Sequence, residues 1–233
     1  MNVDFFRVNG RSAKYSERDV LRALKFNGAV MLLAMVIAAG LAGCGATRPM
    51  QYYQLTVPAE VHHGEMNPSG ISLALGPLVA SHLYREDRIV FGSGTQQMGT
   101  YEFQRWTEPP AEMIEEVLLR ELRASNRYRE VFTQRSASRA DYVLRGRLYD
   151  FKEVSGSPLQ ARVTIEFELR DTKSGATVWS HYYNHDEPVN GKDVPAMVAA
   201  LDHNVQRGVE EIRASLEQYF SGLPPSNNSA TDR

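Results

Sequence analysis

The chain of 233 residues has little of what defines several classes of protein. It contains one cysteine, which excludes an intramolecular disulfide and a CxxC metal or redox site. Its formal net charge is −2, without the basic excess that is typical of nucleic-acid-binding proteins. The charged fraction of 23% is too high for a protein that crosses a membrane many times, whereas 42% hydrophobic residues are ample for a folded core. These absences leave a folded domain of ordinary composition.

Catalytic and cofactor-binding motifs are also absent from the sequence. No serine lies in a GxSxG turn, there is no P-loop, and Gly92-Ser93-Gly94 is too short for a dinucleotide fingerprint. His181 and His185 would lie about 13 Å apart on a strand at ~3.3 Å per residue, so only a bent or helical segment would bring them to one metal ion. We interpret both as solvated hairpin residues. We therefore expect no catalytic residue, no metal and no cofactor, and a protein that is not an enzyme.

The first 43 residues read as a targeting segment. Residues 1–27 hold six Lys and Arg against three Asp and Glu, and residues 28–43 form an uncharged run. This run is shorter than the ~20 residues that a membrane-spanning helix needs. A charged start, a short apolar run and a small-residue end are typical of a secretory signal peptide, which we predict over residues 1–43.

Leu41-Ala42-Gly43-Cys44, at the end of that run, resembles the lipobox of bacterial lipoproteins. In that family the cysteine thiol takes a diacylglycerol, the chain is cut just before the cysteine, and the new amino group is acylated. The alternative is an uncleaved anchor with a chance cysteine. Because the sole cysteine falls at the junction of the apolar run and the polar chain, we predict a covalent lipid on Cys44, detectable as palmitate.

Gly45 follows the cysteine, where such lipoproteins carry Asp when they stay in the inner membrane. The resemblance therefore implies an anchor in the inner leaflet of the outer membrane, with the domain facing the periplasm. Residues 44–50 form the lipid-anchored linker, and the six residues after Cys44 span at most ~20 Å at roughly 3.5 Å each. The folded domain must then lie against the membrane.

Hydrophobic periodicity predicts one domain over residues 51–221 and a polar, disordered tail over residues 222–233. Seven stretches read as strands: 51–57, 71–75, 100–106, 129–133, 141–151, 163–169 and 177–183. The strand at 71–75 is expected to bury one face and to end at Gly76-Pro77.

Two amphipathic helices complete the pattern. One follows Pro109-Pro110, and the other starts at Asp193 and Pro195 and ends at Gly222. We assign the apolar stripe of the second helix to the core. The order of elements predicts an α+β fold, a single domain in which two helices pack on a mixed, mainly antiparallel sheet.

Four stretches of the chain carry a further pattern: Tyr52–Leu55, Leu83–Val90, Tyr101–Pro110 and Asp141–Leu148, with Trp179 on a later strand. Together they resemble the ABC-type transport auxiliary lipoproteins, a family typified by the paraquat-inducible protein C lipoproteins. Arg105-Trp106-Thr107-Glu108-Pro109-Pro110 is the most specific run, since it is similar to the family's Arg-Trp-Ala-Glu-Pro-Pro. Thr107 replaces the usual Ala, and the second stretch lacks the family's Asp-Arg-Pro spacing.

This resemblance implies a non-enzymatic component of an intermembrane lipid transport system. In such systems an inner-membrane ABC or related transporter works with MCE-domain proteins that shield lipid across the periplasm, and the lipoprotein is the outer-membrane end. The implied partners are an MCE-domain protein, through it the inner-membrane transporter, and outer-membrane lipid around the anchor. A homo-oligomer around the end of the conduit is a further expectation, and no nucleic acid is expected.

Partner-binding residues are expected within the stretches that carry the resemblance: Tyr84, Arg88, Arg105, Trp106, Glu108, Pro109 and Pro110. Arg and Trp are enriched in binding hot spots, and proline keeps a junction rigid. The structural alternative is that Trp106 caps the core and Arg105 pairs with Glu108. The functional alternative is a periplasmic carrier that holds an acyl chain in its own core, which requires an apolar cavity of roughly 300–1,000 Å³.

Overall fold

The computed structural model describes residue 31 and residues 48–57, 70–93, 96–134 and 139–223. The chain divides into two compact units, Met1–Arg48 and Pro49–Arg233, and the second unit holds every strand and helix named below. Cys44, nearly all of the predicted signal peptide and most of the predicted tail lie outside the described residues.

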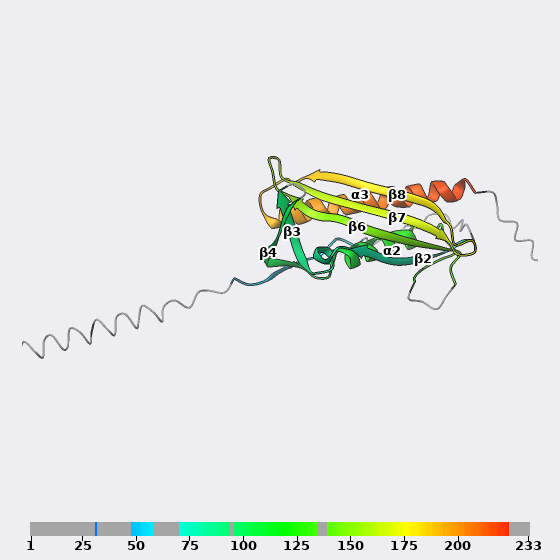
Figure 1. Ribbon diagram of the computed structural model, residues 1–233, viewed down its shortest axis with the longest axis horizontal. Helices are drawn as coiled ribbons and strands as arrows, with labels where there is room; N and C mark the ends of the chain where they lie inside the picture. The colour runs from blue at the N-terminus through cyan, green and yellow to red at the C-terminus, as the bar shows by residue number, and fades with distance from the viewer. Residues whose placement is uncertain (1–30, 32–47, 58–69, 94–95, 135–138, 224–233) are drawn as a thin grey trace, which may run out of the picture. The chain divides into compact units, whose positions relative to one another are not determined.

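The second unit is an α+β domain, as the sequence predicts (Figure 1). Its elements follow in the order β1 (Gln51–Tyr53), β2 (Ser72–Ala80), the short 3-10 helix η1 (His82–Tyr84), β3 (Arg88–Ser93), β4 (Gln97–Trp106), α2 (Pro110–Ala124), β5 (Glu130–Thr133), β6 (Tyr142–Val154), β7 (Gln160–Asp171), β8 (Thr177–Pro188) and α3 (Val194–Ser221). All seven predicted strands and both predicted helices are present.

The long strand β6 is the centre of an eight-stranded mixed sheet. One edge of β6 pairs with β7 in an antiparallel ladder, and β8 continues this ladder on the far side of β7. The other edge of β6 pairs in parallel with β2 along its first half and with β3 along its second half. Strand β5 extends the sheet beyond β2, and β4 and then β1 extend it beyond β3. The two longest ladders are antiparallel, which confirms the predicted character of the sheet.

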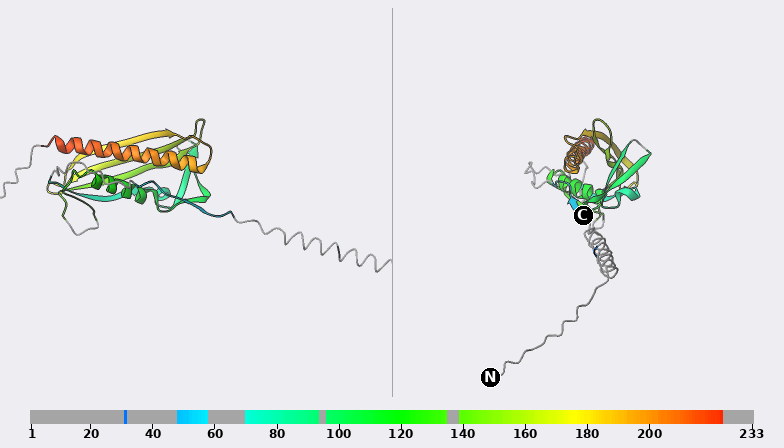
Figure 2. Two further views of the ribbon diagram at one scale, coloured as in Figure 1. Left: turned by 180° about the vertical axis from the view of Figure 1, so that it is seen from behind. Right: turned by 90° about the vertical axis from the view of Figure 1, so that its left-hand side faces the viewer.

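Both helices cover the same face of the sheet (Figure 2). Helix α3 packs on β7 and β8, and α2 packs on β2 and β5. The core between the layers is built from Leu118 of α2, Ile165 of β7 and Val205 of α3, each at most 1% exposed. The clean alternation of β7 and the apolar stripe of α3 therefore mark core-facing positions, as predicted.

Strand β2 differs from its prediction in two respects. Both of its faces are buried at the start, since Ser72 and Ala74 are as inaccessible as Leu73. Ser72 is accommodated because its backbone N–H and its hydroxyl both donate to the carboxylate of Asp141, each at 2.8 Å. The strand also continues through Gly76-Pro77 to Ala80, and the register with β6 shifts at that point. A proline is tolerated at such an irregularity because the ladder needs no donor there.

Strand β3 is the eighth strand and was not predicted. Its apolar residues Ile89 and Val90 follow a charged turn, and they are too few to show a period of two. The strand is fixed instead by its neighbours, with β4 antiparallel on one side and β6 parallel on the other. The parallel pairing with β6, which joins Val90 to Lys152, is distant in the chain and leaves no local sequence signal.

Candidate functional site

The junction between β4 and α2 contains most of the partner-binding candidates. Trp106 is 1% exposed, and the centroid of its ring lies 5.3 Å from that of Phe151 on β6. The backbone N–H of Trp106 donates to the carbonyl of Asp87 at 2.7 Å, and the backbone N–H of Thr107 donates to the carbonyl of Tyr53 at 2.8 Å. Trp106 therefore caps the core, as the structural alternative predicts.

The guanidinium of Arg105 is turned back on its own strand. Its Nη1 donates to the carbonyls of Tyr101 at 2.6 Å and Gln104 at 3.0 Å. Its Nε lies 3.8 Å from the carboxylate of Asp87, and the side chain is 13% exposed. The acidic partner of Arg105 is thus Asp87, and the predicted pair with Glu108 is wrong.

Two prolines start helix α2 directly after this junction. The carbonyl of Pro109 accepts from the N–H groups of Glu112 at 2.9 Å and Met113 at 3.2 Å. Pro110 occupies the first helical position, where an N–H would have no partner within the helix. Because Pro110 is buried and Pro109 is half-buried, the prolines set the direction of α2 and present little surface.

Of the other two candidates, Tyr84 is buried and Arg88 is exposed. Tyr84, on η1, is 2% exposed, and its hydroxyl donates to the carboxylate of Asp150 at 3.4 Å. Burial raises the pKa of the Tyr84 hydroxyl above its ordinary value, so this group stays protonated. Arg88 is exposed on β3 and lies 3.2 Å from the carboxylate of Glu86. Of the seven candidates, Arg88 and Glu108 are the ones that the structure exposes.

A row of charged side chains crosses β6, β7 and β8 on the face away from the helices. Nζ of Lys152 lies 2.6 Å from the carboxylate of Asp150, although its side chain is only 4% exposed. Arg162 donates from Nε and Nη2 to the two carboxylate oxygens of Asp186, each at 2.7 Å. These hydrogen bonds from Arg162 hold the pKa of Asp186 below its ordinary value. Each charge has an opposite partner, so the row stabilises the sheet.

The two histidines of β8 face α3, and both are partly exposed residues of the β7–β8 hairpin, each with an acidic neighbour. Nε2 of His181 lies 2.8 Å from the carboxylate of Glu211, and that of His185 lies 3.4 Å from the carboxylate of Glu187. Arg207 of α3 lies 2.9 Å from the same Glu187 carboxylate. The period of two predicts that both histidines share one face, but it does not show which helix covers that face. Among the residues that the structure describes, no group of His, Cys, Asp and Glu is arranged to hold a metal ion.

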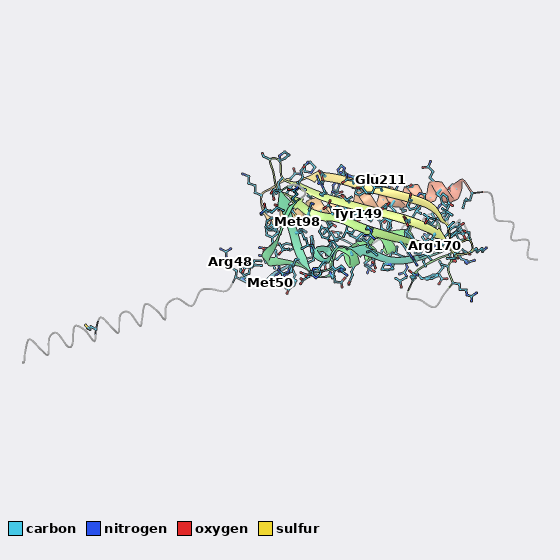
Figure 3. The ribbon with its side chains drawn as sticks, in the orientation of Figure 1. Arg48, Met50, Met98, Tyr149, Arg170 and Glu211 are labelled. Atoms are coloured by element: carbon cyan, nitrogen blue, oxygen red, sulfur yellow. The ribbon has the colours of Figure 1, made fainter. Side chains whose placement is uncertain are left out.

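An aromatic patch on the outer face of the sheet was missed in the sequence. Tyr149 and Tyr182 are 44% and 59% exposed, and their rings lie 6.3 Å apart. The Arg147 guanidinium carbon lies 6.0 Å from the centroid of the Tyr149 ring, and Val79 of β2 pairs with Arg147 in register. Figure 3 shows Tyr149 on the face of the sheet opposite the helices. The alternation of β8 places Tyr182 on this face, but Tyr149 is the unpaired residue of a bulge in β6 that the sequence does not reveal.

The described residues line two open grooves on the surface of the domain. One, of about 480 Å³, runs between α2 and α3 and is lined mainly by polar side chains such as Glu121, Gln206 and Arg213. The other, of about 490 Å³, lies between β2, β5 and α2 and includes Glu112 and Glu115. Both grooves are open to solvent and have charged residues in their lining, unlike the enclosed apolar cavity that an acyl chain requires.

Within the described ranges, no helix is both long and apolar enough to cross a bilayer.

Comparison with known proteins places these features in a family. Residues 53–213 match the family model described as "ABC-type transport auxiliary lipoprotein component". The fold is similar to that of a Xanthomonas campestris protein of the family DUF330, with 18% identity and a TM-score of 0.65 over 73% of this chain and 97% of that one. A second solved structure, titled only as an uncharacterized protein, has 12% identity and a TM-score of 0.57 over 72% of this chain and 99% of that one. No curated protein matches the chain.

Proposed function

The chain belongs to the family of ABC-type transport auxiliary lipoprotein components, and from this premise we propose that it is the outer-membrane lipoprotein of an MCE-type lipid transport system. In this proposal residues 1–43 are a signal peptide, Cys44 carries the lipid anchor, and residues 44–50 link it to the domain. The domain over residues 51–221 docks the periplasmic conduit, and through it the inner-membrane transporter, without catalysis. Residues 222–233 form a disordered tail.

The filled interior is the observation that favours docking over an acyl-chain carrier. Leu118 and Leu122 of α2, Ile165 of β7 and Leu201 of α3 are at most 1% exposed where the helices meet the sheet. Side chains at this depth occupy the space that a carrier would leave for its ligand. The function then depends on what the surface binds.

We place the docking contact at the surface around Arg88 and Glu108, the exposed candidates. Arg88 pairs in register with Arg105, and Glu108 follows three residues later at the start of α2. The buried Tyr84, Trp106 and Pro110 and the half-buried Arg105 and Pro109 support this surface from within. Exposed charges at the rim of an interface govern the rate and specificity of association more than they govern folding.

Charge reversal tests the docking surface. Arg88→Glu and Glu108→Arg should leave the melting temperature unchanged, because exposed ion pairs contribute little to stability. The double variant should lower co-purification with the MCE-domain protein of the same cell by about tenfold. Glu168→Arg, at an exposed site on β7, is the matched control and should co-purify fully.

Arg105→Ala separates folding from docking. Since Arg105 is bonded to its own strand, this variant should melt at a lower temperature and lose binding only in proportion to its unfolded fraction. Full co-purification of the double charge-reversal variant would move the docking contact away from this surface.

A further inference from the structure

Three uncharged stretches of chain meet at one end of the domain. Residues 49–59, 89–101 and 154–161 contain no Asp, Glu, Lys, Arg or His. The β3–β4 hairpin lies beside the β6–β7 turn, since Gly92 pairs with Val154 and the Ser155 N–H donates to the Gly92 carbonyl at 2.8 Å. Strand β1 runs parallel to β4 beside the last residues of that strand, with Gln51 opposite Gln104.

Three large apolar or aromatic side chains are exposed at this end, among exposed Gln and Ser side chains, and the exposed Arg48 lies two residues before Met50. Met50 is 44% exposed, Met98 is 43% exposed and Tyr52 is 61% exposed. Figure 3 shows Met50 and Met98 at the same end of the long axis of the domain, and Arg170 at the other end. Uncharged backbone turns with exposed Met and Tyr side chains suit the interface between lipid headgroups and acyl chains.

The opposite end of the domain is strongly charged. The β7–β8 turn carries Asp171 and Lys173, next to Arg170. The Thr172 N–H donates to the carbonyl of Asp141 at 3.0 Å, which brings the ion pair of Asp141 with Arg129, at 3.5 Å, to the same place. The domain is therefore polarised along its long axis. At the uncharged end, the loop into α3 contributes Lys192 and Asp193, and Asp193 caps the helix by accepting from the N–H of Ala196.

The length of the linker determines which end can reach the anchor. Six residues separate Cys44 from β1, and they span at most ~20 Å. Because Met50, directly before β1, lies at the same end of the long axis as Met98 in Figure 3, a lipid on Cys44 holds that end within this distance of the bilayer. Charged groups resist transfer into a lipid interface, whereas the three uncharged stretches do not.

We propose that the end formed by Met50, Met98, the β3–β4 hairpin and the β6–β7 turn lies on the lipid surface at headgroup depth. This inference rests on the proposed anchor at Cys44. The charged end then points into the periplasm. Because none of the three stretches carries a charge, their contact with lipid depends little on ionic strength and on the headgroup charge.

Depth-dependent quenching tests this orientation. The lipidated protein is reconstituted into phosphatidylcholine vesicles with Met98→Cys, a unique free thiol when Cys44 is lipidated, and labelled with the fluorophore NBD. Lipids with a doxyl group in the acyl chain should quench this probe at least about twofold, and equally at low and high salt. A probe at Lys173→Cys, at the charged end, is the control and should not be quenched.

A second variant tests the role of the side chain. With the probe at Ser93→Cys on the hairpin, Met98→Glu should reduce quenching because a carboxylate resists the interface. Val79→Glu, which adds the same charge to a residue 50% exposed on β2, should leave quenching unchanged.

The outcomes separate this inference from the proposed anchor. If the protein floats with the vesicles and the Met98 probe is not quenched, the orientation is overturned and the anchor stands. If NBD emission shifts to the blue without quenching by lipid, a protein surface covers this end and the orientation is also overturned. If the unlabelled protein does not float, the anchor and the orientation both fall.

Discussion

Replacing Asn204 by alanine tests how α3 is fixed on the sheet. This side chain is 0% exposed, and it makes three hydrogen bonds to β7 and β8. Its Nδ2 donates to the carbonyls of Ala161 and His185, each at 2.9 Å, and its Oδ1 accepts from the hydroxyl of Tyr183 at 2.6 Å. Alanine removes all three bonds and leaves their partners inside the protein.

The expected loss follows from the partners that remain. A buried polar group without a hydrogen bond costs ~1–3 kcal/mol. The Tyr183 hydroxyl keeps one acceptor in the variant, because it also donates to the backbone carbonyl of residue 204 at 3.1 Å. Both carbonyls lose this donor, so Asn204→Ala should lower the free energy of unfolding by about 3–7 kcal/mol, with the lost Tyr183 bond included. This loss is a large part of the free energy of unfolding of a typical domain, which is about 5–15 kcal/mol.

Urea unfolding followed by tryptophan fluorescence measures this loss. Tyr183→Phe is the matched control, because it removes the hydroxyl and leaves both Nδ2 bonds in place, and it should cost about 1 kcal/mol. If Asn204→Ala costs no more than Tyr183→Phe, the two carbonyls have other partners and the reasoning fails.

Three further predictions concern the anchor, the core and the response to acid. Cys44→Ser should abolish metabolic labelling with palmitate and leave an uncleaved precursor; label retained by the variant would contradict the lipid anchor. Ile165→Ala, at a position 1% exposed, should lower the free energy of unfolding by about 2–5 kcal/mol, measured by urea titration. Arg162 depresses the pKa of Asp186, so the stability that this pair provides is present above the ordinary pKa of about 4 and is lost as pH falls through the lower folded value. Asp186→Asn should therefore flatten the acid limb of stability against pH below about pH 4, and an unchanged limb would exclude this pair as its cause.

The parts of the fold that the sequence predicts are those with a strong local period. The alternation of β7 and the stripe of α3 each place many residues on one face, so burial alone determines both elements. The prediction ends strand β2 at residue 75 because proline normally ends a strand. Only the register shift against β6 shows how Pro77 is tolerated. Parallel pairing of β2 and β3 along one edge of β6 has no local signature at all.

The candidate site shows a different limit. Arg105 and Trp106 belong to the most specific motif of the chain, yet their side chains serve the interior of the domain. A family motif can thus mark a folding requirement, and a single sequence does not separate that requirement from binding. Asn204 was missed for a related reason, since one polar residue in an apolar stripe gives no hint of the carbonyls that it meets across the core.

Strand β1 has a mechanical consequence. It lies parallel to β4 over only three residue pairs, from Gln51 with Gln104 to Tyr53 with Trp106. Just beyond it, the Thr56 N–H donates to the carboxylate of Asp202 at 2.9 Å, and Gln206 donates to the Thr56 carbonyl at 2.6 Å. Tension applied through residue 48 along the strand direction loads these bonds in shear, so they resist together and do not open one after another. Force on the chain is thus shared between the edge of the sheet and helix α3. The strength of these few hydrogen bonds determines the force at which β1 detaches and the domain begins to unfold.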